Sequence, residues 1–207
     1  MTHHPEQYKP ETEQLWRANI YGLLATLLAT PPDNATLKML ANIDRQSRDE
    51  LDTPIENALH KLTEKAREMD GEVIREEYQT LFIGITRGEV VPYGSWYQTG
   101  FMMDKPLAEL RSVLASLGYE RREGVYESED HVAALCDVMR GLITDTSEDL
   151  DTTLTKQRTI YNDHISTWIT RFFKDLQAAE HASFYGTLAV LGETFMVLEK
   201  EYLKLDG

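Results

Sequence analysis

The chain has 207 residues, and its 21 Lys and Arg against 35 Asp and Glu leave a formal net charge of -14 at pH 7. A surface this acidic repels phosphate, so nucleic acid is not expected as a partner, and the charge favours either a basic partner or simply solubility. The longest uncharged stretch, residues 18–32, ends in two prolines and is shorter than the roughly 20 apolar residues that a membrane span needs. We therefore expect no membrane span.

The N-terminal segment and the cysteine content both favour the cytoplasm. Residues 1–14, MTHHPEQYKPETEQ, contain neither the basic region nor the apolar region of an export signal. The single cysteine, Cys136, lies in an apolar helical run and is expected to be reduced and buried. A cytoplasmic location is the resulting prediction.

Apolar residues recur at helical spacing through most of the chain, which predicts an all-α fold. A weak strand pattern at residues 88–93 is the one competing signal. Asp33 is expected to cap the second helix and Pro54 to open the third, while a later helix starts at Pro106 and stops at Gly118. The helices expected in the N-terminal half cover residues 11–29, 34–42, 55–69 and 73–82.

The C-terminal half follows a charged linker at residues 119–127. Ser128 is predicted to cap the next helix, residues 150–176 form a helical run with a break near Asp163 and His164, and Ser183 is predicted to cap the last helix. The expected architecture is a bundle-like single domain, residues 1–207, with a hinge at about 119–128 between its N- and C-terminal halves. Such a hinge makes a domain-swapped dimer conceivable, but a monomer with a minor dimer is favoured.

A long non-helical run at residues 84–105 interrupts the helical pattern. Connections between bundled helices usually take about two to eight residues, so this loop is unusually long. It contains EVVPYGSWYQTG, whose Tyr93, Trp96 and Tyr97 either plug a groove between helices or form a recognition surface. In an acidic protein, the second interpretation favours a basic, partly apolar peptide as the ligand.

Common catalytic and phosphate-binding motifs are missing from the sequence, including GxGxxG, GxxxxGK[ST], CxxC, HExxH and GxSxG. The remaining cluster of chemical groups is ESEDH at residues 127–131. One interpretation is a metal-dependent hydrolase built around Asp130 and His131, which would need a distant third ligand. The alternative is helix capping, with acidic side chains at the positive end of the helix dipole, and the local pattern favours it.

Two blocks of the sequence resemble the TorD/DmsD family of cytoplasmic chaperones. Residues 77–100 match its E-Y-x-x-L-F-x-G helix end followed by P-Y/W-x-S-x-Y/W. Residues 127–135, ESEDHVAAL, match E-P-x-D-H-x-x-x-L, with Ser128 in place of the usual proline. A weaker similarity lies in the H-x-x-x-W-x-x-x-F spacing that starts at His164 and in the Phe184-Tyr185 pair, so the resemblance covers roughly residues 16–198.

The resemblance implies an all-α protein without enzymatic turnover or cofactor. Such a chaperone binds the twin-arginine signal peptide of a molybdenum-cofactor oxidoreductase and holds the precursor in the cytoplasm until the cofactor is inserted and export follows. These motifs do not identify the client oxidoreductase. Some family members have been linked to guanine nucleotides, but no phosphate loop accompanies the motifs here.

Peptide-binding positions also follow from the resemblance. In the expected mechanism, acidic groups near Asp130 pair with the two arginines, and the apolar part of the signal lies against the aromatic and leucine side chains. Trp96 falls at a variable family position. The implied positions are Tyr78, Leu81, Phe82, Pro92, Tyr93, Ser95, Tyr97, Asp130 and His131.

Overall fold

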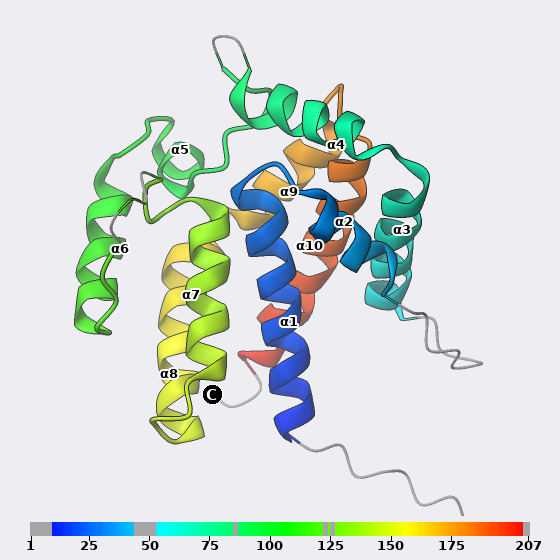
Figure 1. Cartoon of the computed structure of the whole chain (residues 1–207). Helices are drawn as coiled ribbons and strands as arrows, with labels where there is room; N and C mark the ends of the chain where they lie inside the picture. Colours follow the sequence, from blue (N-terminus) through cyan, green and yellow to red (C-terminus); the bar gives the residue numbers. More distant parts are fainter. Residues whose placement is uncertain (1–9, 44–52, 85–86, 122–123, 125–126, 205–207) are drawn as a thin grey trace, which may run out of the picture.

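The computed structural model describes residues 10–43, 53–84, 87–121, 124 and 127–204, and within them the chain is all-α (Figure 1). These residues contain ten α-helices and two π-helical turns. In chain order they are α1 (Pro10–Ala29), α2 (Asn34–Ala41), α3 (Pro54–Glu68), α4 (Gly71–Tyr78), a π turn (Gln79–Ile83), α5 (Gly94–Thr99), α6 (Lys105–Ser116), α7 (Val132–Thr144), α8 (Leu150–Ile160), a π turn (Tyr161–Ile165), α9 (Ile169–Ala178) and α10 (Phe184–Tyr202).

Local start and stop signals account for several helix boundaries. The carboxylate of Asp33 accepts the N–H of Thr36 at 2.7 Å, and Thr53 with Glu56 forms a capping box at the start of α3. Gly118 follows α6 with φ 79°, a left-handed conformation that favours glycine. The first three predicted helices and the break near residues 163–164 are therefore confirmed.

The central predicted loop is the main error at the level of helices. Residues 84–105 are not continuously non-helical, because they contain α5, which Gly100 ends at φ 83°. The weak strand at residues 88–93 does not form either, and an isolated antiparallel bridge between Tyr93 and His131 stands in its place. The short helix α5 packs against α6 and α9, so contacts distant in sequence favour it where local propensity does not. The helix expected at residues 73–82 begins earlier, at Gly71, and passes into the first π turn.

The predicted cap of α7 is also wrong. Ser128 does not cap this helix, which begins at Val132. His131 occupies the cap, and its Nδ1 accepts the N–H of Ala133 at 3.1 Å. The hydroxyl of Ser128 is directed instead at the carboxylate of Asp130.

The start of α10 is capped by a residue from another helix. Ser183 occupies the predicted position, but its side chain makes no capping hydrogen bond. The buried carboxylate of Glu77 in α4 accepts the N–H groups of the cap residue Ser183 and of the first two residues of α10, Phe184 and Tyr185, at 2.7–3.1 Å. A cap supplied from more than 100 residues away leaves no trace in the local sequence.

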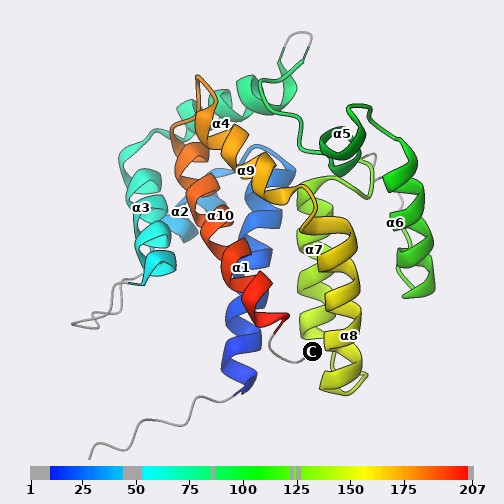
Figure 2. The same ribbon diagram turned by 180° about the vertical axis from the view of Figure 1, so that it is seen from behind.

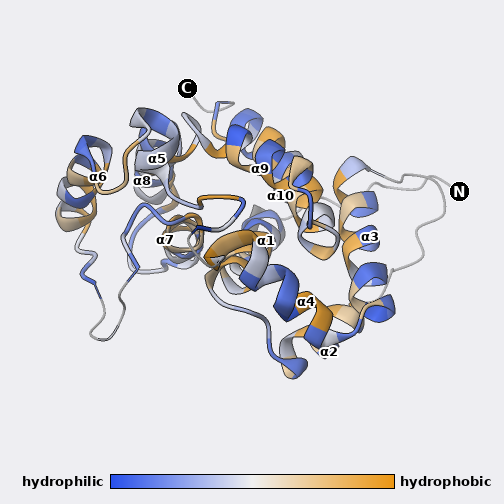
Figure 3. Cartoon of the chain, turned by 90° about the horizontal axis from the view of Figure 1, so that it is seen from above, coloured by the Kyte–Doolittle hydropathy of each residue, from blue (hydrophilic) through white to orange (hydrophobic). Residues whose placement is uncertain are grey.

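Helix α1 lies at the centre of the molecule, between α7 and α10 (Figures 1 and 2). Helix α7 also packs against α8, and α10 packs against α3 and α9. Viewed from above, α3 and α6 lie at opposite ends (Figure 3). Helices from both halves of the sequence thus share one buried cluster, in which Cys136 is buried as predicted.

The hinge predicted at residues 119–128 and the single-domain assignment stay predictions. Residues 122–123 and 125–126 of this segment lie outside the described residues. In the part of the chain that the structure describes, no helix has the length and apolar character needed to cross a bilayer.

A buried ion pair ties three helices together. Arg17 of α1 and Glu199 of α10 are each about 1% exposed, and their side chains form two hydrogen bonds of 2.6 and 2.8 Å. The same guanidinium donates to the side-chain oxygen of Gln157 in α8 at 2.9 Å. Because unpaired buried charge is costly, this network favours one relative placement of the three helices.

Candidate functional site

The two sequence blocks that carry the family resemblance are joined by backbone hydrogen bonds. The N–H of Gly94 donates to the carbonyl of Asp130 at 2.9 Å, and the N–H of Val132 donates to the carbonyl of Pro92 at the same distance. These bonds form the isolated antiparallel bridge. These bonds fix the segment EVVPYGSWYQTG (residues 89–100), called the aromatic loop below, against the start of α7.

The side chain of Asp130 strengthens this junction. It is 3% exposed, one carboxylate oxygen accepts the N–H of Ser95 at 2.8 Å, and the other accepts the hydroxyl of Ser128. The hydroxyl of Ser95 in turn accepts the N–H of Met103 at 3.1 Å. Both oxygens of Asp130 are thus engaged inside the protein, an arrangement typical of a positioning residue.

His131 and Tyr93 pack together beside the junction, with ring centroids 5.0 Å apart and an edge-to-face geometry. Burial lowers the pKa of His131 to about 4, although Glu127 and Asp130 act in the opposite direction. The imidazole is therefore neutral at pH 7, and because Nδ1 accepts a hydrogen bond, Nε2 carries the proton. The hydroxyl of Tyr93 donates to the carboxylate of Glu127.

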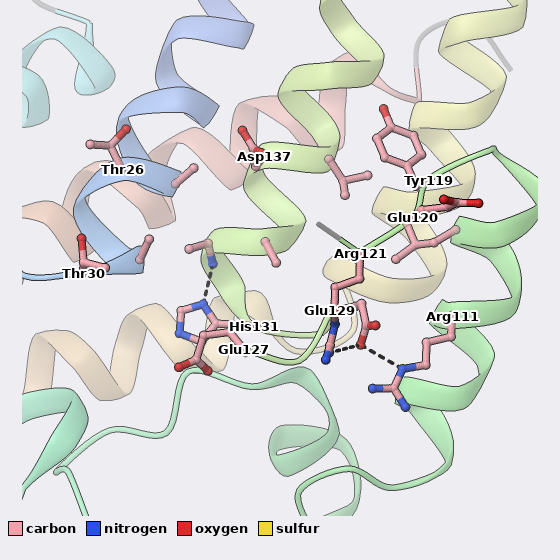
Figure 4. Close-up of a pocket in the computed structure, with 16 residues that line it drawn as sticks. Thr26, Thr30, Arg111, Tyr119, Glu120, Arg121, Glu127, Glu129, His131 and Asp137 are labelled. Atoms are coloured by element: carbon pink, nitrogen blue, oxygen red, sulfur yellow. Dashed lines mark hydrogen bonds and ion pairs between the residues drawn. The ribbon is translucent and has the colours of Figure 1, made fainter. Parts of the chain in front are cut away.

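A groove of about 730 Å³ lies next to this junction, between α1, α6 and α7 (Figure 4). Small side chains of α1 and α7 leave this space open. The apolar lining consists of Ala25, Ala29, Leu114, Ala133, Ala134 and Val138, together with the ring of Tyr119.

Charged groups also line the groove. Its lining includes four carboxylates and two guanidinium groups, those of Glu120, Glu127, Glu129, Asp137, Arg111 and Arg121. One oxygen of Glu129 accepts a hydrogen bond from Nε of Arg111 at 2.9 Å and lies 3.1 Å from Nη2 of Arg121, as Figure 4 shows. The groove therefore combines an apolar surface with carboxylates that can bind a cationic ligand.

The predicted site residues fall into three groups. His131 lines the groove, and Tyr93 is hydrogen-bonded to Glu127, which also lines it. Pro92, Ser95 and Asp130 form the junction beside the groove. The remaining predicted positions lie in two other clusters.

Tyr78, Leu81 and Phe82 lie where the first π turn packs on α10. Leu81 is fully buried, and Phe82 lies 4.9 Å from Tyr78 and 5.3 Å from Tyr185 between ring centroids. The hydroxyl of Tyr78 donates to the carbonyl of Leu28 at the end of α1. These contacts make the cluster part of the core, although Phe82 keeps partial exposure.

Tyr97 lies against α9. Its ring stacks on Trp168 at 5.7 Å between centroids, and its hydroxyl donates to Asp175 at 2.9 Å. The guanidinium of Arg87 lies over the ring of the neighbouring Trp96, 4.3 Å from the ring centroid. Peptide binding by these positions stays a prediction.

Arg111, Arg121 and the small residues of α1 were not predicted as site residues. Ala25 and Ala29 repeat at a spacing of four, as do Thr26 and Thr30, and such a stripe of small side chains on one helix face is a signal that sequence reasoning could use. The meeting of Arg111 and Arg121 at Glu129 depends on the packing of α6 beside α7, which no local pattern encodes.

The metal-dependent hydrolase interpretation has little support at this site. Among the described residues, no group of three or more His, Cys, Asp or Glu side chains could hold a metal ion. Both oxygens of Asp130 and Nδ1 of His131 already accept hydrogen bonds.

Known proteins with similar sequences are named as chaperones, and a solved structure with a similar fold is named as a redox enzyme maturation protein. The chain is 23% identical over 202 residues to the chaperone protein TorD of Vibrio atlanticus, covering 90% of this chain and 94% of that protein. It is 29% identical over 186 residues to a Haemophilus influenzae protein described as a Tat proofreading chaperone, DmsD, covering 86% and 87%. A crystal structure described as a redox enzyme maturation protein from Archaeoglobus fulgidus matches with a TM-score of 0.57 and 16% identity, over 95% of this chain and 98% of that one.

A family model identifies the chain directly. Residues 48–174, more than half of the chain, match the family described as nitrate reductase delta subunit. Together with the interlocked motif blocks and the all-α fold, this match shows that the chain belongs to the TorD/DmsD family.

Proposed function

We propose that this protein is a cytoplasmic chaperone that binds the twin-arginine signal peptide of a molybdenum-cofactor oxidoreductase. It holds the precursor until the cofactor is inserted and then releases it for export. Family membership and the names of the relatives support this function. The observation that carries it is the groove beside His131, where an apolar surface and several carboxylates lie together at the junction of the two motif blocks.

Both parts of the peptide have a counterpart in the groove. The apolar segment of the signal packs on the small residues of α1 and α7 and on Leu114 of α6. The arginines pair with carboxylates that line the groove, in an acidic protein that attracts cations over a longer range. Tyr93 and His131 form the edge of this surface.

The interaction has to be reversible, because the precursor must leave. An affinity near 1 μM, about -8 kcal/mol, permits release, whereas picomolar binding would trap the client. The protein acts as a monomer with a minor dimer and without turnover of its own. Light scattering that detects only dimer over a wide dilution range would contradict the monomer, and robust, mutation-sensitive activity in a substrate screen would contradict the absence of turnover.

The test is a titration with a labelled peptide that carries two adjacent arginines and a following apolar segment. Replacing both arginines by glutamine should weaken binding at low salt, and the difference should shrink at high salt because exposed charges are screened. Equal affinities of the two peptides at low salt would exclude recognition of the arginines by carboxylates.

A groove variant locates the binding surface. Ala134 of α7 lines the groove, so Ala134→Leu should fill part of it and weaken peptide binding. Ala108→Leu places the same side chain on an exposed position of α6 outside the lining and should bind like the wild type. Equal binding by both variants would place the peptide elsewhere.

A further inference from the structure

Glu129 holds two guanidinium groups that the chain itself supplies. Arg111 comes from α6, Arg121 from the linker after it, and Glu129 from the turn before α7. Both arginines approach the same carboxylate oxygen, at 2.9 and 3.1 Å, and all three side chains line the groove (Figure 4).

Other groove carboxylates are engaged differently. Glu127 accepts the hydroxyl of Tyr93, and Asp137 pairs at 2.9 Å with Arg140, three residues further along the same helix. Glu129 therefore differs from both in joining two arginines from segments outside its own turn.

The contacts of Arg111 and Arg121 with Glu129 are exposed enough for another guanidinium group to replace them. The side chains of Arg111 and Arg121 are 50% and 38% exposed, whereas that of Glu129 is 22% exposed. Ion pairs between exposed groups usually contribute little to stability, since water and salt compete with them. The more shielded carboxylate can thus keep a guanidinium partner while the identity of that partner changes.

We propose that Glu129 is the carboxylate that receives the arginines of the signal peptide, and that Arg111 and Arg121 occupy it until a client binds. This inference rests on the proposed function and names its specificity-determining residue. Two guanidinium groups already fit on this carboxylate, so an incoming pair of arginines can replace contacts of the same geometry. A planar guanidinium fork matches a carboxylate better than an ammonium group does, so the site prefers arginine to lysine.

The experiment measures how each protein variant changes the discrimination between peptides. The full-length chain is titrated with the same apolar peptide carrying Arg-Arg, Lys-Lys or Gln-Gln. Glu129→Gln should weaken Arg-Arg binding about tenfold and bring it close to Gln-Gln binding, because the acceptor charge is lost. Arg111→Gln with Arg121→Gln should strengthen Arg-Arg binding about three- to tenfold, because the internal competitors are removed.

Matched controls separate this mechanism from a change in overall charge. Lys105→Gln with Lys204→Gln removes two charges from exposed pairs outside the groove and should leave the ratio of Arg-Arg to Gln-Gln affinities unchanged. Glu127→Gln tests the neighbouring carboxylate and should change that ratio less than Glu129→Gln does. Thermal melts of each variant confirm that it is folded.

Several results would overturn the assignment. If the wild type discriminates Arg-Arg from Gln-Gln but Glu129→Gln keeps the same ratio, the proposed function stands and Glu129 only fastens the linker to α7. Equal strengthening by the arginine and lysine double variants would show a field effect in place of competition. If neither the wild type nor any variant binds any of the peptides, both this inference and the proposed function are wrong.

Discussion

Asp130 illustrates how burial changes the role that a charged side chain can play. Its carboxylate is enclosed and accepts hydrogen bonds from the backbone of Ser95 and the hydroxyl of Ser128. A peptide arginine could reach it only by displacing bonds that hold the loop. Stability, more than affinity, should therefore depend on this residue.

Substitution of Asp130 separates these two roles. Asp130→Ala leaves the Ser95 N–H without its partner and should lower the free energy of unfolding by about 1–3 kcal/mol. Asp130→Asn retains one acceptor oxygen and should cost less. Urea denaturation measures both effects, and peptide titration of the folded variants should match the wild type. Weakened binding with unchanged stability would show instead that Asp130 binds an arginine of the peptide.

His131 should make stability depend on pH. Its folded pKa of about 4 lies below the ordinary value of 6.5, so the unfolded chain binds the proton more tightly. The stability that comes from keeping this imidazole neutral is fully present above pH 6.5 and is lost as the pH falls toward 4. Between pH 7 and 4.5 the loss should reach about 2–3 kcal/mol.

The matched control is His131→Asn, which can still cap α7 but does not titrate in this range. Denaturation curves at a series of pH values should show a steeper decline for the wild type than for the variant. Parallel curves would mean that protonation of His131 does not affect folding.

The site could be predicted from the sequence in part. The local patterns drew attention to Asp130, His131 and Tyr93, but their assignment as peptide-binding positions came from the family resemblance and stays a prediction. Sequence alone could not show that the oxygens of Asp130 face Ser95 and Ser128, or that Arg111 lies beside Glu129. Such facts depend on the packing of segments far apart in the chain.

At the scale of elements, the cap on α10 connects two distant helices. Glu77 of α4 accepts three N–H groups at the start of α10, and its negative charge lies at the positive end of the helix dipole. Glu77→Gln replaces the charge and places an amide N–H among these donors. We expect this variant to lose about 1.5–3 kcal/mol of stability, the range for hydrogen bonds to charged groups.

The neighbouring Glu76 provides the control, because it is exposed on the same helix. Glu76→Gln should change stability by no more than about 0.5 kcal/mol. Chemical denaturation followed by helix content compares the two variants. Equal costs would show that the cap contributes nothing beyond a surface charge.

Helix positions could be predicted where the signals are local. The first three helices have periodic apolar faces and nearby caps at Asp33 and Thr53, so their bounds followed from the sequence. Helix α5 could not be predicted, since it is held by α6 and α9, and the cap of α10 could not be predicted, since it comes from α4.

At the scale of the whole molecule, Arg17, Gln157 and Glu199 join α1, α8 and α10. Glu199→Gln leaves the guanidinium buried without a countercharge and should cost about 3–5 kcal/mol. Replacing all three residues by methionine removes both buried charges and the amide of Gln157, and should recover most of that loss. Urea denaturation of the two variants measures the difference.

The exposed pair formed by Glu201 of α10 and Lys204, just after the end of that helix, is the reference. Lys204→Gln breaks the contact of Lys204 with Glu201, and its effect should stay within about 0.5 kcal/mol. A cost for Glu199→Gln no larger than this reference would contradict the structural importance of the buried network.

The backbone bridge between the aromatic loop and α7 has an evolutionary consequence. Its two hydrogen bonds use only main-chain atoms, so they fix the position of the loop without dictating the side chains at Tyr93 or Trp96. Gly94 is the exception, because a Cβ there would lie 2.9 Å from Nε1 of Trp168. With that glycine kept, the side chains at positions 93 and 96 can change during evolution without loss of the two hydrogen bonds that hold the loop on α7.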